Sequence, residues 1–268
     1  MSWRVIIVTS VPPVAVGYTE IVRGCGHEAV AIVTPRAGGM TGAHLEHDPE
    51  DLDLVFAASR KSLARIFRGY EADLAVCTGF PWLIPAEAID ALSVGIVNGH
   101  PSLLPRYRGP FPLAWAVRNG ETEVGMSYHL MDAAFDTGNL LAQKAIPLEG
   151  EWSMDELVPK LQAASIELLP QALARLAAGD RGEAQSGGDY QSHFEDEYAV
   201  VDLARTAAEV DRQVRAWAFV PPFAQKGPIL EGRRLIVTSV TEVDGAERIE
   251  CADAPLWIAE SAPLQPAP

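Results

Sequence analysis

Apolar runs alternate with helical patterns along the first part of the chain. Four of these runs are rich in β-branched and small apolar residues, as is typical of strands that are buried on both faces of a sheet. They predict strands at residues 4–10, 28–34, 72–79 and 93–100. Helical patterns cover residues 14–27, 59–70 and 85–92, with a loop at 35–51. This alternation predicts an α/β fold, with a Rossmann-like, doubly wound and mostly parallel sheet covered by helices on both faces.

The predicted strands and helices continue to residue 179, where a polar stretch follows. Residues 123–131 and 139–148 are predicted as strands, and residues 112–120 as a helix. A long helix is predicted over residues 153–179, opened by the capping box Ser153–Glu156. The polar, glycine-rich stretch 180–198 is typical of a linker.

The last part of the chain has a helical pattern followed by short strands. The helix is predicted at 206–219, and the strands at 233–243, 247–251 and 255–261. We therefore expect a catalytic domain at residues 1–185, a linker at 186–205 and a small, truncated, OB-like β domain at 206–268.

Composition narrows the class of protein. The 268 residues carry a net charge of −15, which repels nucleic-acid phosphate unless a local basic patch compensates. The three cysteines lie far apart, and neither a metal-ligand spacing nor a disulfide framework is present, so a reducing cytoplasm is expected and no metal. Since no apolar run approaches the roughly 18 residues of a membrane span, no membrane association is expected.

Candidate chemistry lies at strand ends. Asn98 and His100 occupy alternate positions at the carboxyl end of one predicted strand, and ligands of open parallel sheets bind beyond such ends. Asn can donate an N–H to a developing oxyanion, and His can move a proton near neutral pH. Asp136 follows another strand and precedes Thr137–Gly138, a turn sequence that would aim it back. With no nucleophile elbow around Ser102, these groups suit acyl transfer by direct attack of a substrate amine.

The same residues carry a family resemblance. The stretch Asn98-x-His100-Pro-Ser-Leu-Leu-Pro-Arg-Tyr-Arg-Gly109, followed by NGETEVG and MDAAFDTG, resembles the formyltransferases that use 10-formyltetrahydrofolate. Residues 76–85, VCTGFPWLIP, resemble the strand and folate loop of that family. Residues 206–224 resemble the start of the C-terminal domain of methionyl-tRNA formyltransferase and of its amino-sugar relatives.

The resemblance implies roles for individual residues. Asn98 would bind the formyl oxygen and the tetrahedral oxyanion, His100 would lie beside the formyl carbon, and Asp136 would pair with His100 and help to deprotonate the amine. The folate would lie between loops 80–85 and 132–139, held largely by backbone groups. The residues expected there are Phe80, Trp82, Leu83, Ile84, Pro85, Asp132, Phe135 and Asn139.

Other residues have an ordinary interpretation beside the functional one. Arg106, Tyr107, Arg108 and His129 are candidates for substrate binding. The two arginines could equally pair with surface acids, and His129 could be a structural residue of the pocket wall. Phe80 and Trp82 could line the folate cleft or pack within their loop, and Asp132 could be a turn carboxylate.

Charge favours a small-molecule amine as the acceptor. Residues 35–51 contain one arginine and four acids, and residues 199–268 contain seven Lys or Arg and ten Asp or Glu, although a tRNA enzyme needs cations to contact phosphates. We expect an amino sugar, an amino acid derivative or a biosynthetic intermediate. The alternatives are a methionyl-tRNA formyltransferase, a 10-formyltetrahydrofolate hydrolase or a non-catalytic folate-binding protein. The sequence does not fix the oligomeric state, and a homodimer is left open.

Overall fold

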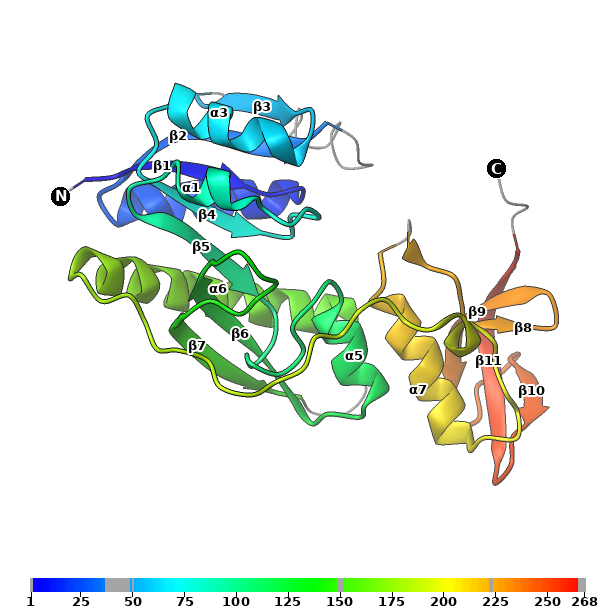
Figure 1. Ribbon diagram of the computed structural model, residues 1–268. Helices are drawn as coiled ribbons and strands as arrows, with labels where there is room; N and C mark the ends of the chain where they lie inside the picture. Colours follow the sequence, from blue (N-terminus) through cyan, green and yellow to red (C-terminus); the bar gives the residue numbers. More distant parts are fainter. Residues whose placement is uncertain (1, 37–48, 50, 149–151, 222–223, 265–268) are drawn as a thin grey trace. The chain divides into compact units, whose positions relative to one another are not determined.

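A seven-stranded sheet organises the first compact unit of the chain (Figure 1). The computed structural model describes residues 2–36, 49, 51–148, 152–221 and 224–264. The strands lie in the order β3-β2-β1-β4-β5-β6-β7. Their bounds are Arg4–Val8 for β1, Glu28–Pro35 for β2, Asp53–Ala57 for β3, Leu74–Thr78 for β4, Gly95–His100 for β5, Glu123–Leu130 for β6 and Leu140–Pro147 for β7.

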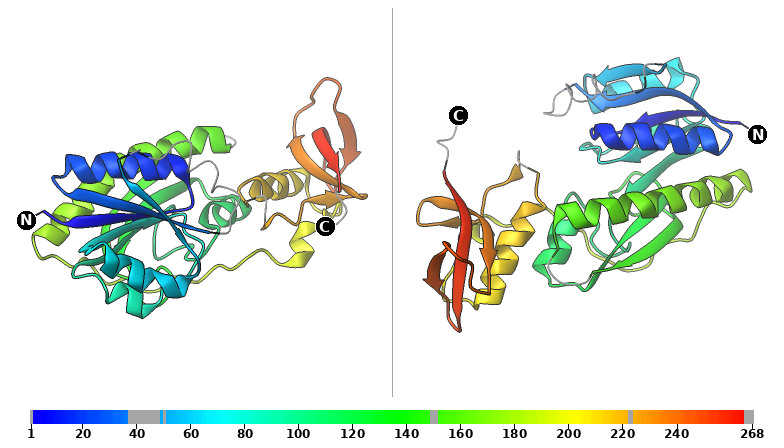
Figure 2. Two further views of the ribbon diagram at one scale, coloured as in Figure 1. Left: turned by 90° about the horizontal axis from the view of Figure 1, so that it is seen from above. Right: turned by 180° about the vertical axis from the view of Figure 1, so that it is seen from behind.

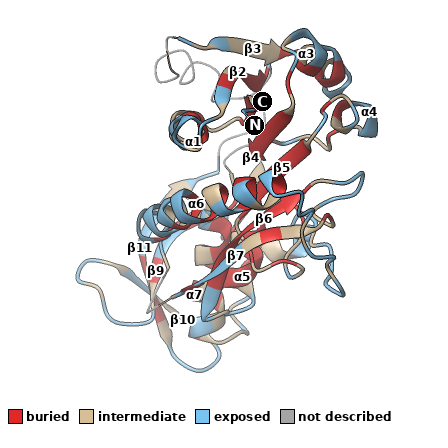
Figure 3. Cartoon of the chain, turned by 90° about the vertical axis from the view of Figure 1, so that its left-hand side faces the viewer, coloured by how far each residue is buried: buried red, intermediate tan, exposed pale blue. Residues whose placement is uncertain are grey.

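The sheet is parallel from β3 to β5 and changes direction at β6. Strand β1 pairs in parallel with both β2 and β4, so the chain order reverses between β1 and β4. Strand β5 pairs in parallel with β4 and antiparallel with β6. Strands β1, β4 and β5 are almost wholly buried, as Figure 3 shows for β4 and β5, which explains the apolar sequences of β1 and β4 and of the first part of β5. The predicted doubly wound, mostly parallel sheet is confirmed.

Helices cover both faces of this sheet (Figure 2). Helices α1 (Pro12–Gly24) and α6 (Met154–Ala177) lie on one face, and α3 (Leu63–Gly69) and α4 (Ala86–Ile89) on the other. On the α3 face, Leu63 and Phe67 pack against strand residues such as Ile6 and Ala75. Helix α6 begins beside Ser153, whose Oγ accepts a hydrogen bond from the Glu156 amide at 3.2 Å, as the capping box predicts.

Two strands differ from the sequence prediction. Strand β3 was not predicted, because its sequence DLVFA follows an acidic stretch and remains partly exposed at the edge of the sheet. Strand β8 (Ile229–Leu230) has only two residues, too few for a periodic pattern. Most of the predicted loop at 35–51 lies outside the described residues.

The second compact unit contains a small antiparallel sheet. Its strands lie in the order β10-β11-β9-β8, where β9 is Arg233–Ser239, β10 Glu247–Glu250 and β11 Pro255–Pro263. Helix α7 (Ala207–Ala218) packs on this sheet through Val210 and Val214, and a capping box of Thr206 and Glu209 fixes its first turn. The expected small β domain is confirmed. Residues 109–124, which contain helix α5 (Pro112–Arg118), and residues 147–158 also belong to this unit, and the predicted boundaries at 185 and 205 stay predictions.

Across the described part of the chain, none of the helices combines the length and the apolar character that crossing a membrane requires.

Candidate active site

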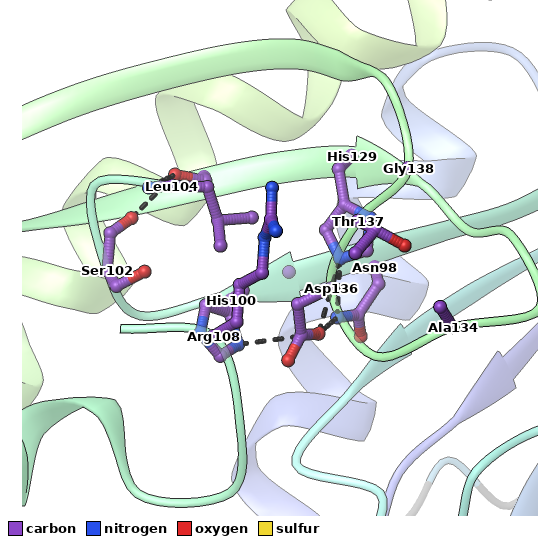
Figure 4. Close-up of polar contacts among 12 residues, drawn as sticks. Asn98, His100, Ser102, Leu104, Arg108, His129, Ala134, Asp136, Thr137 and Gly138 are labelled. Atoms are coloured by element: carbon purple, nitrogen blue, oxygen red, sulfur yellow. Dashed lines mark hydrogen bonds and ion pairs between the residues drawn. The ribbon is translucent and has the colours of Figure 1, made fainter. Parts of the chain in front are cut away.

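Strands β5 and β6 place three polar side chains on one face of the sheet. Asn98 and His129 are direct partners in the antiparallel β5–β6 pair, and Asn98 Nδ2 lies 3.0 Å from His129 Nε2. His100 lies two residues beyond Asn98, so strand alternation turns it to the same side (Figure 4). All three are buried, His129 to 1% exposure. Polar groups at such depth need partners, and here they find them mainly in one another and in the next loop.

Asp136 comes to this face from the loop between β6 and β7. Its backbone has φ of 55°, a left-handed conformation that reverses the chain toward β5. The loop then passes so close to β6 that a Cβ on Gly138 would lie 1.7 Å from the Leu130 carbonyl oxygen, so only glycine fits. The predicted Thr137–Gly138 turn therefore does aim the carboxylate back at the strand end.

The Asp136 carboxylate is the centre of the cluster. Its Oδ1 lies 3.4 Å from Asn98 Nδ2, 3.5 Å from His129 Nε2 and 3.7 Å from His100 Nδ1 (Figure 4). The side chain of Asp136 is 12% exposed, the most accessible of the four. The structure thus brings together the amide, imidazole and carboxylate that the sequence singled out, and adds His129 beside them.

The environment of His100 fixes which of its nitrogens can take up a proton. His100 Nε2 lies 2.8 Å from the Tyr107 carbonyl oxygen, which can only accept, so Nε2 carries the hydrogen and Nδ1 faces Asp136. Burial lowers the pKa of His100, while the Asp136 charge and the Tyr107 carbonyl act in the opposite direction and His129 lowers it further. His100 is therefore neutral at pH 7, with a free lone pair on Nδ1.

Asn98 and His129 orient each other. The Asn98 amide nitrogen can only donate, and its two partners are Asp136 Oδ1 and His129 Nε2; the other ring nitrogen of His129 is Nδ1. That Nδ1 is buried and has no hydrogen-bond partner among the described residues. These contacts fix the orientation of the Asn98 amide at the strand end.

Gln185 supports the loop that carries Asp136, and sequence reasoning missed it. Its Nε2 donates to the carbonyl oxygens of Asp136 at 3.0 Å and Gly138 at 2.7 Å. Its Oε1 accepts from Arg108 Nε at 3.3 Å and Nη2 at 3.0 Å. Gln185 lies in the polar stretch interpreted as a linker, where neither its residue type nor its spacing distinguishes it from its neighbours. Arg108, a candidate for substrate binding, is engaged in holding Gln185.

The remaining predicted residues make their contacts around this cluster. Asp132 behaves as a turn carboxylate, accepting from Thr137 Oγ1 at 2.7 Å and from the Ala134 amide at 3.0 Å. Phe135 is 45% exposed and lies beside Tyr190, and Asn139 donates to the Arg181 carbonyl. The exposed Arg106 lies over the Tyr107 ring.

In the other predicted folate loop, aromatic and apolar side chains pack inward. Phe80 and Trp82 form an edge-to-face pair with ring centroids 5.3 Å apart, and both pack against the core. Ile84 is 1% exposed, Leu83 is half-buried, and Pro85 precedes α4 directly. A ligand at this loop would therefore meet backbone groups and the outer edges of the rings. Within the described ranges, no group of three or more His, Cys, Asp or Glu is placed to hold a metal ion.

Comparisons with known proteins identify the family. Residues 29–173 match the formyl transferase family. Over 230 residues the chain is 33% identical to a methionyl-tRNA formyltransferase of Sinorhizobium medicae, covering 81% of this chain and 74% of the relative. Over 185 residues it is 34% identical to a GDP-perosamine N-formyltransferase of Brucella melitensis, covering 69% and 71%. The strand-end cluster thus belongs to a member of the formyl transferase family, an enzyme of group transfer.

A solved structure shares the fold. The chain superposes on HypX from Aquifex aeolicus in complex with tetrahydrofolic acid, with a TM-score of 0.72 and 18% identity. The match covers 99% of this chain and 45% of HypX, so the chain spans less than half the length of that protein. At this identity the likeness concerns the fold.

Proposed function

We propose that the protein transfers the formyl group of 10-formyltetrahydrofolate to the amine of a small molecule. The observation that carries this proposal is the buried cluster in which the Asp136 carboxylate lies within 3.7 Å of Asn98, His100 and His129. An amide donor, a neutral imidazole and a carboxylate suit acyl transfer without a covalent enzyme intermediate. Membership in the formyl transferase family and the tetrahydrofolic acid in the HypX structure support the choice of donor.

Each residue of the cluster has a distinct task in this proposal. Bound 10-formyltetrahydrofolate supplies a formyl carbon that is open to attack by an amine. When the donor binds, Asn98 Nδ2 exchanges its 3.4 Å contact with Asp136 Oδ1 for a hydrogen bond to the oxygen of that formyl group, and this bond stabilises the negative charge that develops on the oxygen. His100 Nδ1 takes the proton that the attacking nitrogen loses, because Nε2 is already committed to the Tyr107 carbonyl. Asp136 stabilises the resulting imidazolium and holds the ring in position. His100 then gives the proton to the folate nitrogen as the bond between that nitrogen and the formyl carbon breaks, which releases tetrahydrofolate and leaves the formylated amine.

The Ser and Cys side chains near the cluster favour direct attack by the acceptor amine over attack by a nucleophile of the enzyme. Ser102 is 3% exposed and its Oγ donates to the Arg106 carbonyl at 2.8 Å, so it is not held as a nucleophile by a base. Cys77 is also buried, and burial raises the pKa of its thiol well above the usual range, which keeps it protonated and unreactive. The amine nitrogen of the acceptor itself is left as the attacking atom.

The choice of a small amine as the acceptor rests on the charge of the chain. The net charge of −15 and the excess of acids over bases in residues 199–268 favour a small amine over a polyanion. Relatives of both kinds are similar in identity: the GDP-perosamine N-formyltransferase at 34% and the methionyl-tRNA formyltransferase at 33%. The small-molecule acceptor is our proposal, and the cytoplasmic location and a homodimer stay predictions.

The test is an acceptor panel. The purified protein is incubated with 10-formyltetrahydrofolate and, separately, with amino-sugar nucleotides, amino acid derivatives and charged initiator tRNA, while tetrahydrofolate release and product mass are followed. The proposal predicts a formylated small amine and no product with Asn98→Ala. Efficient formylation of tRNA that weakens steeply as salt rises would instead assign a tRNA acceptor. Release of formate with every acceptor would assign a hydrolase.

A further inference from the structure

Arginine side chains surround a cavity in the second compact unit, outside the catalytic cluster. The cavity has a volume of about 240 Å³ and is lined by Arg118, Asn119, Tyr198, Arg205, Glu209 and Arg212. These residues come from the end of helix α5, from the 3-10 helix at Asp196–Ala199, from the segment just before α7, and from α7 itself. Three guanidinium groups around one cavity are unexpected in a chain whose net charge is −15.

Two of the three arginines are held in place by other groups. Arg118 forms an ion pair with Glu195, and its guanidinium lies over the Tyr198 ring at 4.0 Å from the centroid. Arg205 pairs with Glu209 at 3.3 Å, and the other carboxylate oxygen of Glu209 accepts from the Thr206 amide and hydroxyl. The acids near the cavity are therefore used in fixing Arg118, Arg205 and the helix cap.

Arg212 is the third arginine of the cavity, and it differs from Arg118 and Arg205 in its contacts. It is half-buried and makes no hydrogen bond or ion pair within the part of the chain that the structure describes. Its Nη1 lies against Gly120, where an added Cβ would be only 3.1 Å away and where φ is +68°. A half-buried, permanently charged group without an acid partner favours binding of an anion from solution.

Tyr198 provides a fixed hydroxyl beside these charges. Its carbonyl oxygen accepts from Gln213 Nε2 at 2.6 Å and Trp217 Nε1 at 3.0 Å, and its ring stacks on that of Trp217. Burial raises the pKa of Tyr198 to about 12, against the opposing effect of the charges of Arg118, Arg205 and Arg212. The phenol thus stays protonated and can donate to an oxyanion at neutral pH.

We propose that this cavity binds the phosphate group of a small molecule. Donors that reach it from three separate elements suit a tetrahedral group with several oxygens better than a planar carboxylate. The volume of the cavity is about eight times the roughly 30 Å³ that one water molecule occupies in the liquid. This leaves room for further atoms attached to the phosphate. Arg212 supplies the unpaired charge, and Arg118, Arg205 and Tyr198 supply oriented donors.

Calorimetric titration of the full chain tests this proposal. The probes are inorganic phosphate, guanosine diphosphate, acetate and uncharged tRNA at physiological salt. The expected result is one saturable site for phosphate and for the nucleotide, with acetate weaker. Arg212→Ala should raise the Kd for both phosphate probes by about tenfold or more, the usual effect of losing a charge-assisted hydrogen bond. Tyr198→Phe, which keeps the ring but removes the hydroxyl, should raise it by about threefold.

Matched controls separate this site from general charge and from the catalytic cluster. Arg248→Ala removes an exposed arginine of the same unit, one that pairs only with the exposed Glu250 among the described residues, and should leave the Kd within about twofold. Asp136→Asn should also leave phosphate binding unchanged. Circular dichroism checks that each variant is folded. If Arg212→Ala does not fold, Arg212→Lys replaces it, because lysine keeps the charge but lacks the planar guanidinium that donates two parallel hydrogen bonds.

Several outcomes would overturn the proposal. These are no saturable binding of either phosphate probe, equal weakening by Arg212→Ala and Arg248→Ala, or acetate binding as tightly as phosphate. Binding of tRNA alone would assign the cavity to nucleic-acid phosphate instead. Because no probe in these titrations is a formyl donor, the result is independent of the proposed reaction.

Discussion

Substitution of Asp136 by Asn removes one negative charge from the proposed catalytic cluster with almost no change of shape. In the native protein, Oδ1 lies 3.4 to 3.7 Å from Asn98, His129 and His100. In the Asp136→Asn variant, the new side chain can still accept from Asn98 through its amide oxygen, so folding is preserved. That same oxygen faces His100 Nδ1, the atom that we expect to take the proton, but it now carries no charge. The change therefore removes the counter-charge of the imidazolium and weakens the hydrogen bond that a protonated His100 would donate.

The size of the effect follows from these two losses. General acid–base assistance contributes about 100- to 10,000-fold to a rate, and a hydrogen bond to a charged group about 1.5–3 kcal/mol, or 10- to 150-fold. We expect kcat for formyl transfer to fall by at least about 100-fold, with KM changed by less than about threefold, since the loss is felt in the transition state. Steady-state kinetics with a saturating formyl donor measure both constants.

The matched control lies in the same loop. Asp132 is exposed and closes the turn by accepting from Thr137 and the Ala134 amide, which an Asn side chain can also do. Asp132→Asn should keep kcat within about threefold of the native value. If Asp136→Asn retains more than a tenth of the native kcat while its thermal unfolding is unchanged, the carboxylate is not part of the proton transfer and the reasoning fails.

Three further predictions concern the support and titration of the site. Gln185→Ala removes the hydrogen bonds to two loop carbonyls and should lower kcat about tenfold. The control Gln171→Ala, on the exposed face of α6, should leave kcat unchanged. Equal kcat values for the two variants would refute the role of Gln185 in holding the loop. Gly138→Ala places a Cβ against the Leu130 carbonyl and should lower both kcat and Tm, while Gly17→Ala, with open space around it, should lower neither. Protonation of His100 Nδ1 removes the base, so kcat/KM should fall only below pH 6.5, the ordinary pKa of histidine, because burial lowers the pKa of His100. Since the Asp136 charge opposes that shift, the acidic limb should move lower still in Asp136→Asn, and a limb above pH 6.5 would contradict the burial argument.

Local sequence predicted much of the fold because the central strands are buried on both faces. Strands β1 and β4 are apolar almost throughout, β5 is apolar up to its polar carboxyl end, and such runs between helical patterns have few alternatives in an α/β protein. Strand β3 lies at the edge, half-exposed, and its five residues contain no alternation that would distinguish them from a loop. The two-residue β8 depends on pairing with β9, which no local pattern encodes.

The proximity of the strand-end residues was predictable for a related reason. Asn98, His100 and Asp136 lie at strand ends, so the topology of the sheet brings them together whatever the intervening loops do. His129 was recognised as a residue of the strand before the Asp136 loop, but its contact with Asn98 depends on the antiparallel register of β5 and β6. Gln185 reaches the loop from 47 residues beyond Gly138, and a single polar side chain at such a distance leaves no periodic signal.

The central claim is that this cluster moves a formyl group directly onto the amine of a small molecule. A single-turnover reaction with isotopically labelled formyl donor tests it, using a mixture of amino-sugar nucleotides, amino acid derivatives and charged initiator tRNA, and following the label by mass spectrometry. The account predicts label in the amide of one small amine, in step with tetrahydrofolate release, no label on the protein, and loss of transfer in Asp136→Asn. Label that appears only on tRNA, only in formate, or on a protein side chain before it reaches the product would contradict it.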